Sequence, residues 1–236
     1  MNKSNLLIVL VILISYVQLI SIHPSMLKLK QNTQFSEPKR TYMSIIGTVL
    51  LNNDYPLSFV AGMLANVYYE SNVGEFESSN VNNKPERLKY LESKFKYNKD
   101  YSGKSISQVS LNELLKMIVN IKTNWKGYFG LGCFQWNKDD SAKLVNLYIK
   151  QGSRDKITME NAAIAEGKMI IEDMKNEFKG IYIEWDAWNN KYNEQVAGDA
   201  GDILCYRYVD SVKIPRYTNC REVKNTAVKI FNIIKN

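Results

Sequence analysis

The chain has 236 residues, of which 45% are hydrophobic and 23% are charged, and its formal net charge is +7. This length and composition fit one globular domain, or at most two small ones, with a real hydrophobic core. The only histidine, His23, stands near the N-terminus, so the rest of the chain excludes Ser-His-Asp and Cys-His mechanisms and histidine-ligated metals.

Residues 1–22 have the layout of a secretory signal peptide. Lys3 gives a short positive start, and a nearly unbroken apolar run follows from Leu6 to Ile14. We expect cleavage near Ser21 and a secreted protein, either extracellular or in the lumen of a secretory or phagocytic compartment. The alternative is a retained signal anchor, but the polar residues of SYVQLIS weaken the stretch as a spanning helix of roughly 20 residues. No later segment is apolar enough for stable membrane insertion.

Residues 23–40 are polar, and we interpret them as an irregular leader that precedes a globular domain over residues 41–236. The domain is expected to begin with a short apolar helix over residues 41–51. NNDYP then forms a turn, and Pro56 stands where the next helix begins.

The pattern predicts a strongly amphipathic helix over residues 57–71. Its apolar stripe runs through Val60, Met63, Val67 and Glu70 at steps of three and four. Glu70 therefore points toward the interior, where a carboxyl keeps its proton because its charged form loses hydration. A glycosidase needs such a retained proton to protonate a leaving oxygen. The alternative is an ordinary glutamate at a helix end.

The rest of the chain is also expected to be mainly helical. After a polar loop over residues 72–101, Ser110 and Thr158 are candidate N-caps. Further helices are predicted over residues 85–95, 111–121, 141–150, 158–178, 196–209 and 221–235. The predicted fold is a mainly α single domain with a small β element near residues 72–80 or 125–135.

The segment YFGLGCFQW is rich in glycine and aromatic residues. Gly130 would let the backbone approach a ligand closely, and Gln135 offers both a donor and an acceptor. Tyr128 and Trp136 would provide flat apolar faces suited to sugar rings. The alternative is a turn packed with core aromatic residues.

Three cysteines allow one disulfide and one free thiol, and export implies an oxidising compartment. Cys205 and Cys220 are the nearest pair in the sequence and are expected to form the bridge. Cys133 is then left over, and the other pairings stay open. So few ligands make a zinc site improbable, and no cofactor is expected.

These two segments together resemble the phage tail lysozyme type of domain, a branch of the lysozyme-like superfamily related to lytic transglycosylases. The family's helix–turn–helix reads roughly A-G-x-L-x-N-x-x-x-E-S, which the chain matches at Ala61, Gly62, Leu64, Asn66, Glu70 and Ser71. Its second signature, a G-Y-G-L-x-Q-W-like turn, resembles residues 127–136. The resemblance covers roughly residues 41–234 and implies an α+β lysozyme-like fold.

The resemblance implies roles for particular residues. Glu70 would be the general acid, and Gln135 would contact the substrate near the cleaved bond. Tyr206 or Tyr208 would match a cleft tyrosine of relatives, and we take Tyr208 as the candidate.

The second catalytic carboxylate is left open by the sequence. Two acidic residues, Glu75 and Glu77, follow the helix of Glu70, and two more, Asp139 and Asp140, follow the Gln-Trp turn. All four could face the cleft or solvent, and we take Glu77 as the candidate. A hydrolase needs two carboxylates at a defined separation. A lytic transglycosylase needs only one, because a hydroxyl of the substrate attacks and forms an anhydro-sugar.

The sequence thus predicts a secreted, monomeric glycosidase that cleaves the bond between N-acetylmuramic acid and N-acetylglucosamine in bacterial peptidoglycan. The basic charge suits an anionic wall, and no dense Lys/Arg block suggests nucleic acid. The alternatives are a lytic transglycosylase, a non-catalytic glycan-binding or toxin-like module, and a membrane-disrupting protein. The last would need a basic amphipathic helix, for which EVKNTAVKIFNIIKN is better interpreted as a core-packing helix.

Overall fold

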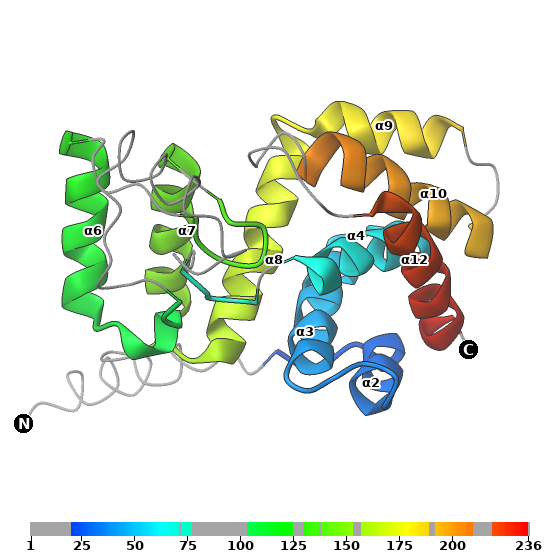
Figure 1. Cartoon of the computed structure of the whole chain (residues 1–236), viewed down its shortest axis with the longest axis horizontal. Helices are drawn as coiled ribbons and strands as arrows, with labels where there is room; N and C mark the ends of the chain where they lie inside the picture. The colour runs from blue at the N-terminus through cyan, green and yellow to red at the C-terminus, as the bar shows by residue number, and fades with distance from the viewer. Residues whose placement is uncertain are drawn as a thin grey trace, which may run out of the picture.

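A computed structural model describes residues 20–70, 72–76, 103–124, 130–136, 138–152, 157–188, 192–209 and 219–235. The described residues are mostly helical, which confirms the mainly α prediction (Figure 1). Four predictions fall on residues outside this description, which are residues 1–19 of the expected signal peptide, the helix predicted over residues 85–95, Glu77 and Tyr128.

The elements follow one another in the order shown by the labels of Figure 1. They are α2 (Pro24–Gln31), α3 (Lys39–Leu51), α4 (Leu57–Tyr69), the 3-10 turn η3 (Ile106–Gln108), α6 (Leu111–Asn124), α7 (Lys138–Gln151), α8 (Met159–Lys175), α9 (Lys179–Ala187), α10 (Glu194–Leu204), the π-helical turn η4 (Cys205–Val209) and α12 (Cys220–Ile234).

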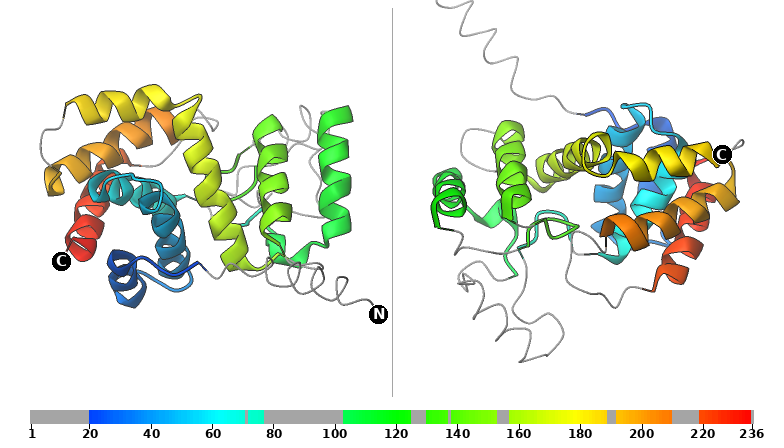
Figure 2. Two further views of the ribbon diagram at one scale, coloured as in Figure 1. Left: turned by 180° about the vertical axis from the view of Figure 1, so that it is seen from behind. Right: turned by 90° about the horizontal axis from the view of Figure 1, so that it is seen from above.

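Helix α8 connects two groups of helices. It packs against α7 on one side and against α3 on the other, and α6 packs on the far side of α7. The second group contains α4, α10 and α12, which all pack on one another, with α9 beside α10. The views from the front, from behind and from above all place α8 between the two groups (Figures 1 and 2).

The segment expected to be an irregular leader is part of the packed fold. Residues 24–31 form α2, which packs on α3 and α12. Met26, Leu29 and Phe35 are buried in the core. Gly47 makes room for this contact, because a Cβ atom there would lie 2.3 Å from the Met26 sulfur. The segment is polar on average, and Leu27 is exposed, but Met26, Leu29 and Phe35 reach the core.

Helix α4 packs closely against α10. A Cβ atom on Gly62 would lie 2.5 Å from the Cβ of Ala200, so only glycine permits this approach. The buried amide of Asn66 donates to the carbonyl oxygens of Gly62 and Gly201, at 2.9 and 3.1 Å. These contacts hold the C-terminal half of α4, which leads to Glu70, firmly against α10.

The small β element is reduced to isolated bridges in the described residues. Three antiparallel bridges join Glu75 to Ser105, Phe76 to Leu131, and Leu131 to Trp136. Backbone hydrogen bonds join these short segments, for example from the Phe76 N–H to the Lys104 carbonyl at 2.9 Å and from the Ile106 N–H to the Gly74 carbonyl at 2.7 Å, but no continuous ladder of strands develops among the described residues. In the described residues the expected small β element is limited to these isolated bridges.

Both predicted N-caps are confirmed. The Thr158 hydroxyl accepts from the backbone N–H of Asn161 at 3.2 Å. The Ser110 hydroxyl accepts from the N–H of Glu113, whose carboxylate accepts from the N–H of Ser110 in return. This reciprocal pair is a capping box at the start of α6.

Two predicted helices end earlier than expected. The helix predicted over residues 158–178 ends at Lys175 with Asn176 as its C-cap, and a separate helix, α9, follows after Phe178. The helix predicted over residues 196–209 changes to the π-helical turn η4 at Cys205. No glycine or proline marks either change, so local sequence patterns did not reveal them.

The C-terminal part of the fold is covalently closed. Cys205 and Cys220 form the expected disulfide, which joins η4 to the start of α12, and Cys133 is buried and takes no part in a disulfide. The inward face of α12 is buried, which confirms that this helix packs in the core. In the described part of the chain, no helix is long and apolar enough to cross a membrane.

Candidate active site

Glu70 lies at the point where α4 ends. Its backbone N–H still donates to the Asn66 carbonyl at 3.1 Å, but its ψ of −165° turns the chain into an extended path. The residue is only 8% exposed, as the apolar stripe of the helix predicted. The position thus combines a buried carboxyl with a chain that leaves the helix into a loop.

Lys39 lies beside this helix end. Its ammonium donates to the carbonyl oxygens of Tyr68, at 2.6 Å, and of Glu70, at 3.3 Å. A cation there interacts favourably with the carbonyl end of a helix. Burial lowers the pKa of Lys39, whereas the nearby charges of Glu75, Cys133 and Glu70 act in the opposite direction. The contact of Lys39 with this helix end cannot be predicted from a local pattern, because Lys39 lies 31 residues before Glu70.

The short segment 72–76 brings a second acidic side chain into the same region. The Glu75 carboxylate accepts from the backbone N–H and the side-chain amide of Asn72, at 3.0 and 2.7 Å. Glu75 is half-buried and acts electrostatically on Lys39, as Glu70 does. Both acidic residues therefore lie in the neighbourhood of one ammonium group.

Gln135 joins the turn 130–136 to the segment 72–76. Its amide nitrogen donates to the carbonyl oxygens of Gly132, at 2.9 Å, and of Glu75, at 3.2 Å. Its φ of +54° is unusual for a residue other than glycine, and such strain is concentrated at functional sites. A Cβ atom on Gly130 would lie 2.7 Å from the Gln135 amide oxygen. Gly130 therefore makes room for Gln135 itself, whereas the sequence analysis expected it to make room for a ligand.

Glu166 of α8 holds these two segments together from beneath. Its fully buried carboxylate accepts from the backbone N–H groups of Gly74, at 2.6 Å, and Cys133, at 3.0 Å, and from the Tyr148 hydroxyl at 2.6 Å. Burial raises the pKa of Glu166, and these hydrogen bonds oppose that rise. One side chain thus fixes the segment after Glu70 relative to the turn that carries Gln135.

Asp173 lies two helical turns further along α8 and holds the end of the same turn. Its carboxylate accepts from the Trp136 indole N–H at 2.9 Å and from the Tyr208 hydroxyl at 2.6 Å. Burial is the main cause that raises the pKa of Asp173 to about 6. Two carboxyls at positions i and i+7 of one helix therefore anchor one turn.

Trp136 and Tyr208 do not offer their rings to a ligand in this structure. Both side chains are fully buried, and both pack edge-on against Phe134. These buried positions do not support the predictions that the Trp136 ring offers a flat face to a sugar and that Tyr208 lines the cleft. Their polar atoms are directed inward to Asp173, so these residues support the turn from within.

The described part of the chain holds no cluster of His, Cys, Asp and Glu that could bind a metal ion. The region instead contains a buried glutamate at a helix end, a second glutamate nearby, one ammonium group and a strained glutamine. Carboxylates can donate and accept protons, so this set is suited to general acid–base chemistry.

The model of one protein family, described as phage tail lysozyme, matches residues 42–234. The chain belongs to the phage tail lysozyme family. No curated protein and no solved structure matches it. Membership supports a lysozyme-like activity that cleaves peptidoglycan, as a hydrolase or as a lytic transglycosylase.

The match with the phage tail lysozyme family includes Glu70, Glu75, Gln135 and the anchoring carboxyls of α8, but it begins after Lys39. The sequence analysis assigned no role to Glu166 or Asp173. A signal was present, because two acidic residues seven apart on the apolar side of a long helix must find buried partners. The sequence did not indicate which partners these would be.

Proposed function

We propose that this phage tail lysozyme family member cleaves peptidoglycan between N-acetylmuramic acid and N-acetylglucosamine, with Glu70 as the general acid. The observation that carries this proposal is the buried carboxyl at the end of α4, in a chain that matches a lysozyme family over residues 42–234. Glu75 and Lys39 add charged groups beside this helix end, which is otherwise apolar.

In the proposed reaction the Glu70 carboxyl donates its proton to the glycosidic oxygen. The bond from that oxygen to the anomeric carbon breaks, and the sugar left behind carries oxocarbenium character. Gln135 lies on the neighbouring turn, where its rigid attachment to Glu75 and Gly132 would give it a fixed position against the substrate. The residue would then orient the sugar, while Glu70 moves the proton.

The step that follows distinguishes two versions of the activity. In a hydrolase a second carboxylate assists water or forms a covalent intermediate, whereas in a lytic transglycosylase a hydroxyl of the substrate attacks. Glu75, which lies near Lys39 as Glu70 does, is one candidate for the second carboxylate. Glu77, Asp139 and Asp140 are the other candidates from the sequence. Replacing each by the corresponding amide should stop a hydrolase that uses it and leave a transglycosylase active.

Secretion is the second part of the proposal. The N-terminal pattern of Lys3 followed by an apolar run supports export, and the net charge of +7 would draw the protein to an anionic cell wall. Basic charge attracts the enzyme over a distance of about one Debye length, roughly 8–10 Å at ordinary salt. Clearing of wall suspensions should therefore slow as ionic strength rises.

The direct test is a turbidity assay on purified bacterial walls with the Glu70→Gln variant. Loss of the donatable proton should reduce the rate by at least about 100-fold, the usual contribution of a general acid. Glu160→Gln is the matched control, because Glu160 is an exposed glutamate in the first turn of α8. Equal rates for the Glu70→Gln variant and the control would refute the assignment.

A further inference from the structure

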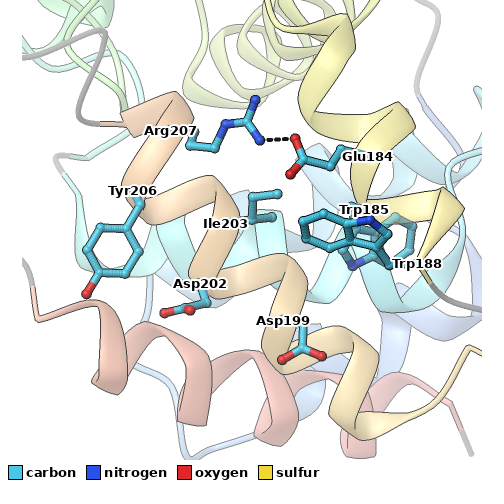
Figure 3. Close-up of a pocket in the computed structure, with 8 residues that line it drawn as sticks. All are labelled: Glu184, Trp185, Trp188, Asp199, Asp202, Ile203, Tyr206 and Arg207. Carbon is cyan, nitrogen blue, oxygen red and sulfur yellow. Dashed lines mark hydrogen bonds and ion pairs between the residues drawn. The ribbon is translucent and has the colours of Figure 1, made fainter.

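A pocket lies on another part of the molecule, between α9 and the stretch formed by α10 and η4. It has a volume of about 470 Å³ and includes Trp188, Asp202 and Tyr206 in its lining (Figure 3). None of its lining residues belongs to the site around Glu70. The volume falls in the range of about 300–1,000 Å³ that is typical of small-molecule sites.

Two aromatic rings at this pocket are exposed. Trp188 is 70% exposed and Tyr206 is 62% exposed, and they come from the two opposite walls. In the view of Figure 3, Tyr206 and Asp202 lie on one side of the stretch formed by α10 and η4, and Trp188 lies on the other side, next to α9. Large exposed aromatic residues in a concave surface are costly in water unless they have a partner to cover them.

The charged groups of the pocket nearly balance one another. Glu184 is ion-paired with Arg207, and Asp199 is ion-paired at 2.7 Å with Lys224, which lies on α12 outside the pocket (Figure 3). Asp202 is in none of the ion pairs that the described residues form. When the two ion pairs and Asp202 are counted together, their net charge is about −1, which is too small to select a cation strongly. Carboxylates and a guanidinium can instead accept from and donate to hydroxyl groups.

The walls are held in place without a ligand. The Trp185 indole N–H donates to the Val196 carbonyl at 3.1 Å, and its ring packs on Phe59 at 5.0 Å. The disulfide between Cys205 and Cys220 fixes η4, from which Tyr206 projects, to α12. A π-helical turn of this kind is often found at functional sites. Preorganised walls reduce the entropy that a bound ligand would otherwise cost.

From the two rings, the nearly neutral polar groups and the rigid walls, we infer that this pocket binds a saccharide. The rings cover the apolar faces of a sugar, while Asp202 and the Glu184–Arg207 pair exchange hydrogen bonds with its hydroxyls. Such a pocket is separate from the cleavage site and would hold the protein on glycan while Glu70 acts elsewhere. Binding there does not depend on Glu70 being catalytic.

The test is a titration of the full chain with tri-N-acetylchitotriose, followed by the 15N-labelled indole signals of the tryptophans. The Trp188 signal, assigned by its loss in Trp188→Phe, should shift to saturation. Removing the Tyr206 ring in Tyr206→Ala should weaken this binding roughly tenfold, as expected for the loss of one aromatic contact. Asp202→Ala should weaken it in the same direction.

Ile183→Ala is the matched control, because Ile183 is exposed on α9 but does not line the pocket. It should bind like the unchanged protein. The inference is overturned if the Trp188 signal does not shift, or if Tyr206→Ala and Asp202→Ala bind as tightly as the control. It is also overturned if Nα-acetyl-lysine methylamide shifts the signal and the trisaccharide does not. The assay measures binding and not cleavage, so it succeeds or fails independently of Glu70.

Discussion

At the scale of single residues, two buried acidic side chains of α8 organise the candidate site. Glu166 accepts three hydrogen bonds and Asp173 accepts two, all from groups in the segments above them or from buried tyrosines. Neither side chain is placed to reach a substrate. Their contribution is to hold the segment after Glu70 and the turn of Gln135 in one arrangement.

Asp173 should make the stability of the protein depend on pH. The folded state holds its proton up to about pH 6, whereas an unperturbed aspartate releases it near 3.8. Between these values the native state binds more protons, so the free energy of unfolding falls as pH rises. The fall should reach about 3 kcal/mol, since one pKa unit corresponds to about 1.4 kcal/mol. The Asp173→Asn variant should lack this pH-dependent fall in the free energy of unfolding.

Urea unfolding of both proteins at several pH values between about 4 and 7 measures the effect. Glu166 titrates in both proteins, so the difference between the two curves isolates Asp173. If the free energy of unfolding depends on pH in the same way in both proteins, then the folded state does not raise the pKa of Asp173.

Lys39 should contribute to the stability of the helix end at Glu70. Lys39→Met removes the cation from the Tyr68 and Glu70 carbonyls and should lower the free energy of unfolding by about 1–2 kcal/mol. It should also slow wall clearing, because the end of α4 would be less well fixed. The Lys39→Arg variant keeps the charge, so it should retain most of the stability and most of the rate of wall clearing. If Met and Arg variants behave alike, the ammonium has no such role.

At the scale of elements, the turn 130–136 depends on glycine at one position. Gly132 has a φ of +79°, and a Cβ atom there would lie 2.8 Å from a Glu166 carboxylate oxygen. Gly132→Ala should therefore cost about 1–3 kcal/mol of stability. Gly180→Ala is the matched control, because a Cβ atom on this α9 residue meets nothing within 4 Å. It should stabilise the helix by about 0.5–1 kcal/mol.

Thermal unfolding of the two alanine variants gives the comparison. A melting temperature below the unchanged protein for Gly132→Ala and at or above it for Gly180→Ala is expected. If both variants melt at the same temperature, the turn does not need the left-handed conformation.

The elements that the sequence predicted are those with strong local patterns. The stripe that ends at Glu70 and the caps at Ser110 and Thr158 depend on residues within a few positions of one another. The helix α2 was missed because only a few of its residues are apolar, and their burial depends on the Gly47 surface of α3. Helix α8 ends at Lys175, and no glycine or proline between Lys175 and Lys179 predicts this end from the sequence.

The supporting contacts of the site could not be predicted, because they join distant positions. Trp136 and Asp173 are 37 residues apart, and Lys39 and Glu70 are 31 apart. Without knowledge of Asp173, the Trp136 ring looked like a surface for sugar, although its N–H is satisfied in the core. Residue types indicated the chemistry, but only the fold shows which aromatic rings remain exposed.

At the scale of the whole molecule, α8 separates two groups of helices and contributes to the junction between them (Figure 1). Glu70 comes from one group, and the turn of Gln135 leads into α7 of the other. The saccharide pocket at Trp188 and Tyr206 lies on the α9–α10 side. This division would allow one part of the molecule to hold glycan while the junction cleaves it.

The most direct test of the central claim is mass spectrometry of purified peptidoglycan after digestion by the unchanged protein, Glu70→Gln and Glu160→Gln. We predict that the unchanged protein and Glu160→Gln release muropeptides. Reducing muramic ends would identify a hydrolase and anhydro ends a lytic transglycosylase, and Glu70→Gln should release neither. Release of the same muropeptides by Glu70→Gln at the unchanged rate would contradict the role of Glu70 as the catalytic acid.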